Sequence, residues 1–439
     1  MKSIAVLGSG IAGLSAAWLL NQKHDVYVFE KQSRIGGHSN TVDTSSHNVS
    51  QPVDTGFIVY NEPNYPNLVA LFDHLNVRTE PSDMSFAVSL RKGQIEFGSR
   101  NMNAIFGQRT NLFSPRFWRM IIDIKRFYSE APDVLKRPEV FRDKTLGQYL
   151  AENRYSAPFI QDFILPMGAA IWSTQADKMR DYPVEAFIRF FSSHGLLQFE
   201  KSITWRTVCG GSRQYLQALT AAFKNPIQIG NGATKVFREG KYVYLIDNNG
   251  NRRKFDALIF ATHADEALEL LKDADPFEKE ILSKFRYVKN RVLLHSDRAL
   301  MPKRQRIWSS WNYMGSAETG PRVTYWMNSL QSIDPKTPLF LSINPKKEPS
   351  LKSVIHDLNY SHPVFDLDAL NAQESLWQIQ GRSNCWFCGS YFGHGFHEDA
   401  LQSGLAVAEE LGAMQRPWNI EDESSRIYRR PAAREGGSL

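Results

Sequence analysis

The first thirty residues alternate between apolar and polar stretches in an order that predicts a strand, a helix and a second strand. Residues 3–7 form a short, mostly apolar run of the length of a buried parallel strand. Residues 14–20 are predicted to be helical, and residues 25–29 form a second strand-like run that ends at an acid. Two strands joined through a helix form a βαβ unit, so an α/β domain is predicted at the start of the chain.

Similar patterns return in two later stretches. They comprise a helix at 213–224, a strand at 227–230, a hairpin of 234–237 with 242–245, a buried strand at 256–262, a strand at 385–389 and a helix at 398–411. We therefore expect one discontinuous domain built from residues 1–81, 210–289 and 385–415.

The intervening residues are expected to form a second, α+β domain from 82–209 and 290–384. Its predicted elements are strands at 324–327 and 339–343 and helices at 115–128, 159–171 and 183–191. The polar, arginine-rich residues 420–439 are predicted to be a disordered tail.

A glycine motif directly follows the first predicted strand, and its members are Gly8, Ser9, Gly10, Ile11, Ala12 and Gly13. Its glycines permit a tight turn, close approach to a pyrophosphate and close packing of the helix on the strand. The helix start offers free N–H groups to phosphate oxygens. Glu30, about twenty residues on, is placed to accept hydrogen bonds from a ribose 2′-hydroxyl, and its charge disfavours NADP. The segment predicts a dinucleotide site for either NAD or FAD.

The residues after Glu30 extend this motif. They include Lys31, Arg34, Gly36, Gly37 and His38. Arg34 supplies a fixed cation near the phosphates, and the glycine pair permits close backbone approach to a bulky ligand. This extension resembles the signature of the flavin amine oxidase superfamily, which includes monoamine oxidases, phytoene desaturases and protoporphyrinogen oxidases. The resemblance implies a Rossmann-like FAD-binding domain with an inserted α+β substrate domain, and it favours FAD over NAD.

The resemblance also implies cofactor contacts from distant segments. They are Thr55, Gly56 and Phe57 in a loop near the flavin ring, Val236 at the adenine, Ala261 beneath the nucleotide, and Gly389, Ser390, Phe396, His397 and Glu398 at the closing element. N–H groups at the start of the last predicted helix would bond the flavin's pyrimidine edge. Lys289 stands where many amine oxidases place a lysine near flavin N5, but an ordinary solvated lysine explains it equally well. No catalytic residue is assigned.

Two departures from the superfamily pattern bear on the substrate. Ser390 and Tyr391 stand where the superfamily usually has an acid, and Phe396 replaces a tyrosine that forms part of an aromatic cage for amines. The stretch from Pro52 to Glu62 resembles a bacterial group linked to modified fatty-acid synthesis. The resemblance therefore implies an FAD-dependent oxidoreductase that dehydrogenates a lipid or fatty-acyl chain by hydride transfer to flavin N5. The alternatives are an amine oxidase that releases aldehyde and hydrogen peroxide, and a non-catalytic escort protein like the GDP-dissociation inhibitors.

The composition and the N-terminal sequence indicate which partners and which cellular location to expect. The net charge of +6 is interpreted as spread along the chain, apart from a short basic tail, so nucleic acid is not expected as a partner. The partners expected are a small-molecule or lipid substrate and oxygen or another electron acceptor. We read no signal peptide, because cleavage would destroy the glycine motif, and expect a cytoplasmic protein. Peripheral contact with the inner membrane face is an alternative, since the predicted helix at 115–128 is basic and amphipathic.

The cysteines and histidines predict no disulfide, redox or metal site. Cys209, Cys385 and Cys388 do not form a disulfide framework. The Cys385 and Cys388 pair flanks apolar residues in a predicted strand, which favours a structural role over a redox role. His394 and His397 are too few ligands for a metal site, and none is predicted.

Overall fold

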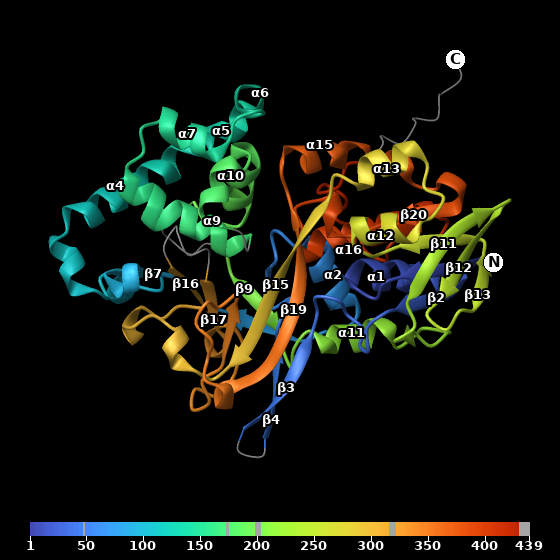
Figure 1. Ribbon diagram of the computed structural model, residues 1–439, viewed down its shortest axis with the longest axis horizontal. Coiled ribbons are helices and arrows are strands. Elements are labelled where there is room, and N and C mark those ends of the chain that lie inside the picture. Colours follow the sequence, from blue (N-terminus) through green and yellow to red (C-terminus); the bar gives the residue numbers. More distant parts are fainter. Residues whose placement is uncertain (47–48, 173–174, 198–202, 316–321, 430–439) are drawn as a thin grey trace.

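The computed structural model describes residues 1–46, 49–172, 175–197, 203–315 and 322–429 (Figure 1). These residues form two bodies, each with its own hydrophobic core. The first surrounds a parallel sheet near the N-terminus, and the second combines a large mixed sheet with a lobe of helices. The α/β fold class predicted from the sequence is confirmed.

The first body is built on a five-stranded parallel sheet. Its strands, in spatial order, are β10 (Gln228–Ile229), β2 (Asp25–Glu30), β1 (Ser3–Leu7), β14 (Ala257–Phe260) and β20 (Cys385–Phe387). Three segments that are distant in sequence thus supply neighbouring strands. Leu7 at the end of β1 lies opposite Phe29 on one side and Phe260 on the other, so these strands end at one edge of the sheet.

Two long helices pack together against this sheet. They are α1 (Ile11–Leu20) and α16 (His397–Glu410). Their approach is so close that a Cβ on Gly404 would lie 2.2 Å from the carbonyl oxygen of Ala12. A glycine is therefore required where α16 crosses α1.

Further elements complete the first body. They are α2 (Pro66–His74), α11 (Arg213–Thr220), α12 (Ala264–Leu270), α13 (Pro276–Leu282), and an antiparallel sheet of β11 (Ala233–Glu239), β12 (Tyr242–Asp247) and β13 (Arg252–Phe255). The predicted β11–β12 hairpin is confirmed. The helix predicted at 213–224 ends four residues early, at Thr220. The first core also takes in side chains of α15 (Leu367–Leu376) and of Ile379, upstream of β20.

The second body is built on a seven-stranded mixed sheet. Its strands, in spatial order, are β19 (Val354–Val364), β15 (Arg286–His295), β18 (Phe340–Ile343), β17 (Arg322–Trp326), β16 (Trp311–Gly315), β7 (Phe86–Leu90) and β8 (Ile95–Gly98). The long strands β15 and β19 run between the two bodies (Figure 1). The sequence analysis predicted the strands at 324–327 and 339–343 but not β19, because its mixture of charged, polar and apolar residues lacks a clear period.

A lobe of helices adjoins this sheet. Its longest members are α4 (Pro115–Glu130), α7 (Leu146–Glu152), α9 (Leu165–Ile171) and α10 (Val184–Ser193). The helix predicted at 159–171 is interrupted by a π-helical turn over Ile160–Ile164, just before Pro166. No helix in the described ranges has the length and apolar character needed to cross a membrane.

Short antiparallel pairs connect the bodies. They are the hairpin of β3 (Thr41–Ser46) and β4 (Val49–Asp54), and the sheet in which β9 (Trp205–Val208) lies between β5 (Tyr60–Asn61) and β6 (Thr79–Ser82).

The start of the predicted disordered tail is ordered in the structure, and the prediction is wrong for residues 421–429. Ile427 is buried, and the Arg426 guanidinium forms an ion pair with Asp399 of α16. The Arg426 backbone N–H also donates to Gln402. Composition alone missed this order because these polar side chains find buried partners on α16. Residues 430–439 lie outside the described residues.

Candidate active site

The glycine loop follows β1 and lies against the end of β14. Gly8 has a φ of +101°, and a Cβ there would lie 2.6 Å from the carbonyl oxygen of Ala261. A Cβ on Gly13 would lie 2.1 Å from the carbonyl oxygen of Gly8. Both glycines are thus required by close packing, and Ala261 lies directly beside the loop.

Gly10 differs from these two glycines because it faces open space. No atom lies within 4 Å of the position that a Cβ on Gly10 would take. Gly10 is the N-cap of α1, and its carbonyl accepts the first intrahelical hydrogen bond, from Leu14. The N–H groups of Ile11, Ala12 and Gly13 precede that bond and have no acceptor within the helix. The start of α1 thus presents free donors beside the open space at Gly10.

Glu30 ends β2 and holds the glycine loop. One carboxylate oxygen accepts the backbone N–H of Ser9 at 3.0 Å and its hydroxyl at 2.6 Å. The other accepts the backbone N–H of Gln32 at 2.8 Å. The side chain is buried and retains lone pairs for a further donor.

The two cations after Glu30 have different surroundings. Lys31 is exposed and forms an ion pair with Glu266 of α12, so the structure places its charge on the surface. Arg34 is half-buried and forms no ion pair with a described acid; its guanidinium donates only to the carbonyl of Ile35, at 3.4 Å. Arg34 therefore fits the predicted phosphate contact, whereas the Lys31 ammonium is engaged by Glu266.

The glycine pair and the following residues cover the loop. The Gly36 N–H donates to the carbonyl of Ser9 at 2.9 Å, and a Cβ on Gly37 would lie 3.2 Å from the Cα of Gly10. Downstream, the Phe57 N–H donates to the carbonyl of His38 at 2.8 Å. These contacts bring two predicted segments together.

Thr55 and Gly56 join the same arrangement. The Thr55 hydroxyl lies 3.0 Å from the carbonyl oxygen of Asn40 and 2.7 Å from the hydroxyl of Tyr360. A Cβ on Gly56 would lie 2.1 Å from the carbonyl oxygen of His38. Gly56 is therefore another glycine that close backbone packing requires.

His38 belongs to a cluster of rings that the sequence analysis did not foresee. Its ring centroid lies 5.2 Å from Tyr360, 5.4 Å from His362 and 6.4 Å from His263. The His38 Nε2 atom is buried and has no hydrogen-bond partner among the described residues. A buried nitrogen without a partner is costly, which is consistent with a group reserved for a ligand.

The partners of His38 lie at positions whose sequence signals were weak. His263 comes two residues after Ala261, at the carboxyl end of a parallel strand, where ligands bind in sheets of this kind. Tyr360 and His362 are two apart on β19 and so share one face of the strand. That alternation was visible in the sequence, but only pairing with β15 shows that this face meets His38.

His397, at the start of α16, lies beside the same region. Its ring stacks on Phe57 at a centroid distance of 3.8 Å, and its Nε2 lies 2.8 Å from the hydroxyl of Tyr215. Burial lowers the pKa of His397 and of His38 to about 3, and the pKa of His362 to about 4. The cluster is thus neutral at physiological pH and can accept or donate hydrogen bonds without carrying charge.

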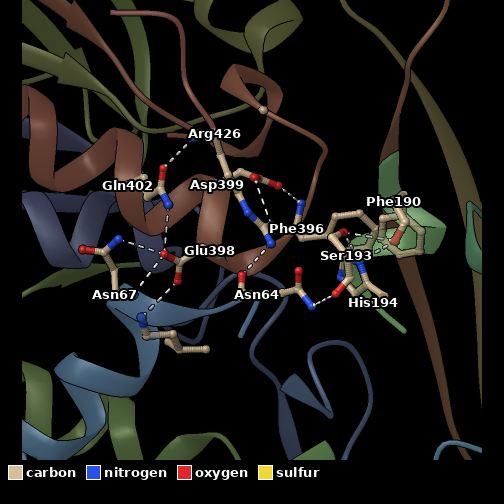
Figure 2. A network of polar contacts seen from close by, with 12 residues as sticks. Asn64, Asn67, Phe190, Ser193, His194, Phe396, Glu398, Asp399, Gln402 and Arg426 are labelled. Atoms are coloured by element: carbon tan, nitrogen blue, oxygen red, sulfur yellow. Dashed lines mark hydrogen bonds and ion pairs between the residues drawn. The ribbon is translucent and has the colours of Figure 1, made fainter. Parts of the chain in front are cut away.

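The Glu398 side chain is engaged by α2 and by Gln402 of its own helix (Figure 2). Its carboxylate accepts the backbone N–H groups of Asn67 and Leu68 at the start of α2, and the side-chain amides of Asn67 and Gln402. The carboxylate is fully buried and its oxygens are engaged. Only the backbone N–H of Glu398 remains for a ligand.

Phe396 packs toward the helical lobe. Its ring stacks on Phe190 of α10 at 5.0 Å, and Phe190 stacks in turn on His194 at 3.8 Å (Figure 2). Asn64 ties this group to the network around Arg426, because it donates to the carbonyl of Ser193 and accepts from Arg426. Phe396 therefore lies where the two bodies meet.

Three other predicted residues lie at the edges of the site. Val236 is buried, and its carbonyl accepts the backbone N–H of Lys272 at 3.0 Å, which leaves a second lone pair on that oxygen. Gly389 follows β20, and its N–H donates to Ser403. The Ser390 hydroxyl forms no hydrogen bond within the described ranges and so fits a ligand contact.

Lys289 is exposed on β15, whereas the adjacent Asn290 is buried. The Asn290 amide lies 2.7 Å from Nδ1 of His362. The possible role of Lys289 beside the flavin is therefore not supported, and Asn290 holds the inward position through His362.

Cys385 and Cys388 are buried thiols rather than reactive groups. They lie in β20 and just after it, and burial raises the pKa of the Cys385 thiol to about 11. Among the described residues, no group of three or more histidine, cysteine or acidic side chains is arranged to hold a metal ion.

Comparison with known proteins gives the family. The model of the family described as flavin containing amine oxidoreductase matches residues 11–308. This match covers more than half of the chain, which therefore belongs to that family. It is an FAD-dependent oxidoreductase. No match was found among curated proteins.

Solved structures show the same fold over nearly the whole chain. The CLA-producing fatty acid isomerase from P. acnes superposes with a TM-score of 0.67 at 15% identity, covering 94% of this chain and 99% of the isomerase. Cyclohexylamine oxidase from Brevibacterium oxydans IH-35A gives 0.66 at 15% identity, with 93% and 99% covered. A putative protoporphyrinogen oxidase from Exiguobacterium sp. 255-15 gives 0.65 at 14% identity, with 93% and 98% covered.

Proposed function

We propose that this protein dehydrogenates an apolar lipid or fatty-acyl substrate with FAD as the electron acceptor. The proposal goes beyond the family in naming a substrate class. The observation that carries it is the packing of Phe396 on Phe190. Phe396 stands where the superfamily pattern has a tyrosine.

The residues around the glycine loop fit FAD. The open space beside Gly10, the free N–H groups of α1 and the unpaired Arg34 together suit a pyrophosphate. Glu30 is placed at the end of β2 for a ribose hydroxyl. The N–H groups at the start of α16 and the unpartnered His38 nitrogen would face the ring system.

Bound FAD supplies a two-electron acceptor, and the protein's part is to bind, orient and exclude water. The ring cluster of His38, His362 and Tyr360 does this without fixed charge, because burial keeps the imidazoles neutral. The neutral Nε2 of His38 is able to hold a proton or bond a polar atom of a ligand. Tyr360 is fixed by Asn40 and Thr55, so the cluster is rigid.

The side chains around Phe396 favour an apolar substrate. Phe396, Phe190 and Trp172 form one aromatic group, with ring centroids 5.0 and 4.9 Å from Phe190. The nearest acids, Glu398 and Asp399, are buried and engaged with the network of Figure 2. An ammonium group would find no unpaired carboxylate among these residues, whereas a hydrocarbon chain would be well solvated. One of the structural neighbours acts on a fatty acid, which supports the same class.

Anaerobic bleaching of the bound flavin tests the proposal. The purified, yellow protein is mixed without oxygen with fatty acids, acyl thioesters, isoprenoids, polyamines and cyclic amines in turn. Loss of flavin absorbance with the lipids, and not with the amines, is the expected result. Bleaching by amines alone would overturn it and favour the amine oxidase reading, which the likeness to cyclohexylamine oxidase keeps as the alternative. In that case Phe396→Tyr should preserve or raise amine turnover.

Glu30→Ala should weaken FAD binding roughly ten- to hundredfold, as expected for loss of a charge-assisted hydrogen bond worth about 1.5–3 kcal/mol. The carboxylate also holds Ser9 of the glycine loop, so the loop loses its anchor. Titration of the apoprotein with FAD measures the change. Lys31→Ala is the matched control, and we expect its affinity to equal that of the parent because Lys31 pairs with Glu266 on the surface. Equal affinity of Glu30→Ala and parent would contradict the ribose assignment.

A lipid substrate reaches the enzyme from a bilayer, so we include peripheral contact with the inner face of an acidic membrane in the proposed function. The chain would then work in the cytoplasm and dock transiently.

A further inference from the structure

Large apolar side chains are exposed together at one end of the molecule. They are Met102, Leu112, Phe113, Trp118 and Ile122, and we call them the 102–122 surface. Phe113 is 87% exposed and Ile122 is 64% exposed, which is unusual for such side chains. α4 lies at this end, far from the parallel sheet and the N-terminus (Figure 1).

Local contacts hold these side chains in one place. The indole N–H of Trp118 donates to the carbonyl of Leu112 at 2.9 Å and so fixes the turn before α4. Trp118 also packs on Phe106, with ring centroids 5.7 Å apart, beside the short helix α3 (Met102–Ile105). Ile122 is one helical turn beyond Trp118 and shares its face of α4. Trp118 thus connects α4 with the turn before it and with the end of α3.

Positive charge is concentrated in the same segment. Residues 100–126 contain six cations, Arg100, Arg109, Arg116, Arg119, Lys125 and Arg126, and one acid, Asp123. Their net charge is +5, so cations strongly outnumber acids in this segment. Asp123 is buried and pairs with Arg126. Arg109, Arg119 and Lys125 form no ion pair with a described residue.

The opposite face of α4 is not available to a partner. Phe117 and Ile124 are buried in the core of the helical lobe, and Ile121 and Tyr128 pack against it. The apolar stripe that the sequence analysis considered for a membrane is therefore used inside the protein. The exposed surface is a different one, which the helical period alone did not reveal.

We propose that the 102–122 surface docks on an anionic lipid bilayer. Protruding Phe113 and Ile122 would enter the headgroup region, Trp118 suits the interface, and the unpaired cations would meet acidic headgroups. The exposed aliphatic side chains Met102, Leu112 and Ile122 suit a hydrocarbon layer, whereas single-stranded nucleic acid is bound by cations and by aromatic rings that stack on bases. The proposed function supplies only the reason for such contact, namely a lipid substrate, and it does not supply the residues.

Flotation of the full-length holoprotein with vesicles tests the proposal. The vesicles contain phosphatidylcholine alone or phosphatidylcholine mixed with phosphatidylglycerol. We expect binding to the anionic vesicles and weak binding to the neutral ones. Phe113→Asp should abolish flotation, while Leu351→Asp, at a site 92% exposed outside this surface, should leave it unchanged.

A double variant that removes two positive charges tests the electrostatic part of the proposal. Arg119→Gln with Lys125→Gln should weaken binding roughly thirtyfold, since each basic residue near an anionic surface contributes about 1 kcal/mol. The matched control is Lys279→Gln with Lys284→Gln. Lys279 lies in α13, Lys284 follows that helix, and both are exposed. No binding of the parent to anionic vesicles would overturn the proposal. So would equal binding of the parent and Phe113→Asp. Flavin bleaching in solution is a separate readout, so the proposed function can fail while this surface stands.

Discussion

The free energy of unfolding should fall by about 6 kcal/mol between pH 7 and pH 5.5, because five histidines with strongly lowered pKa values must stay neutral in the folded state. Burial lowers the pKa of His38, His194 and His397 to about 3, and that of His295 and His362 to about 4. Such a loss is comparable with the whole stability of a typical domain, about 5–15 kcal/mol.

The direction follows from proton binding. In the unfolded chain a histidine titrates near pH 6.5, so below that pH the unfolded state binds protons that the folded state refuses. Stability is therefore fully present above pH 6.5 and is lost as the pH falls toward the folded pKa values. Asp54 and Glu398 act in the opposite sense, because burial raises their pKa and the folded state binds their protons first. They offset part of the loss at the lower end of the range.

Urea unfolding at a series of pH values measures this effect. His295→Gln should make the dependence shallower by about one proton, because this residue lies buried within the large sheet, away from the glycine loop. The exposed His74→Gln is the control and should leave the slope unchanged. A midpoint that is constant from pH 7.5 to pH 5 would show that these histidines are charged in the folded protein.

Glu398→Ala should destabilise the protein by about 3–5 kcal/mol without lowering the flavin content of the native fraction. The carboxylate accepts four hydrogen bonds from Asn67, Leu68 and Gln402, and its removal leaves these buried donors without an acceptor. The start of α2 would lose the contact that ties it to α16. Denaturant unfolding gives the free energy, and the ratio of flavin to protein absorbance gives the content.

Glu410→Ala is the matched control on the same helix. Glu410 is exposed and accepts one hydrogen bond, from the indole N–H of Trp377 at 2.8 Å. We expect it to cost about 1 kcal/mol or less. If Glu398→Ala were as stable as the parent but lost its flavin, the carboxylate would be a cofactor ligand and the structural role assigned to it would be wrong.

Glu30 and Glu398 differ in how much of their surroundings a sequence motif could predict. Glu30 lies in a continuous βαβ unit, where a short stretch of chain fixes its distance from the glycine loop. Glu398 was placed by the resemblance at a helix start, and the backbone of that helix start is where it was expected. Its side chain, however, turns to α2, because that helix needs an acceptor for its first N–H groups.

The ring cluster around His38 consists of residues that are distant in sequence, and local patterns could not predict their contact. His38 directly follows the glycine pair, so the sequence marked it. His263, Tyr360 and His362 come from β14's end and from β19, and no local pattern links them to His38. Their meeting depends on the pairing of β19 with β15 and on the way those long strands join the two bodies.

The sequence alone predicted the βαβ unit, its glycine motif and Glu30 at the end of the second strand, because these residues lie close together in the chain. The resemblance to a known superfamily favoured FAD. The tertiary structure alone decided which side chains have partners within the protein, as for Glu398, Lys31 and Phe117, and which stay without them, as for His38, Phe113 and Arg119. Burial and hydrogen bonding are set by neighbours distant in sequence, and those neighbours are brought together only when the strands and helices pack.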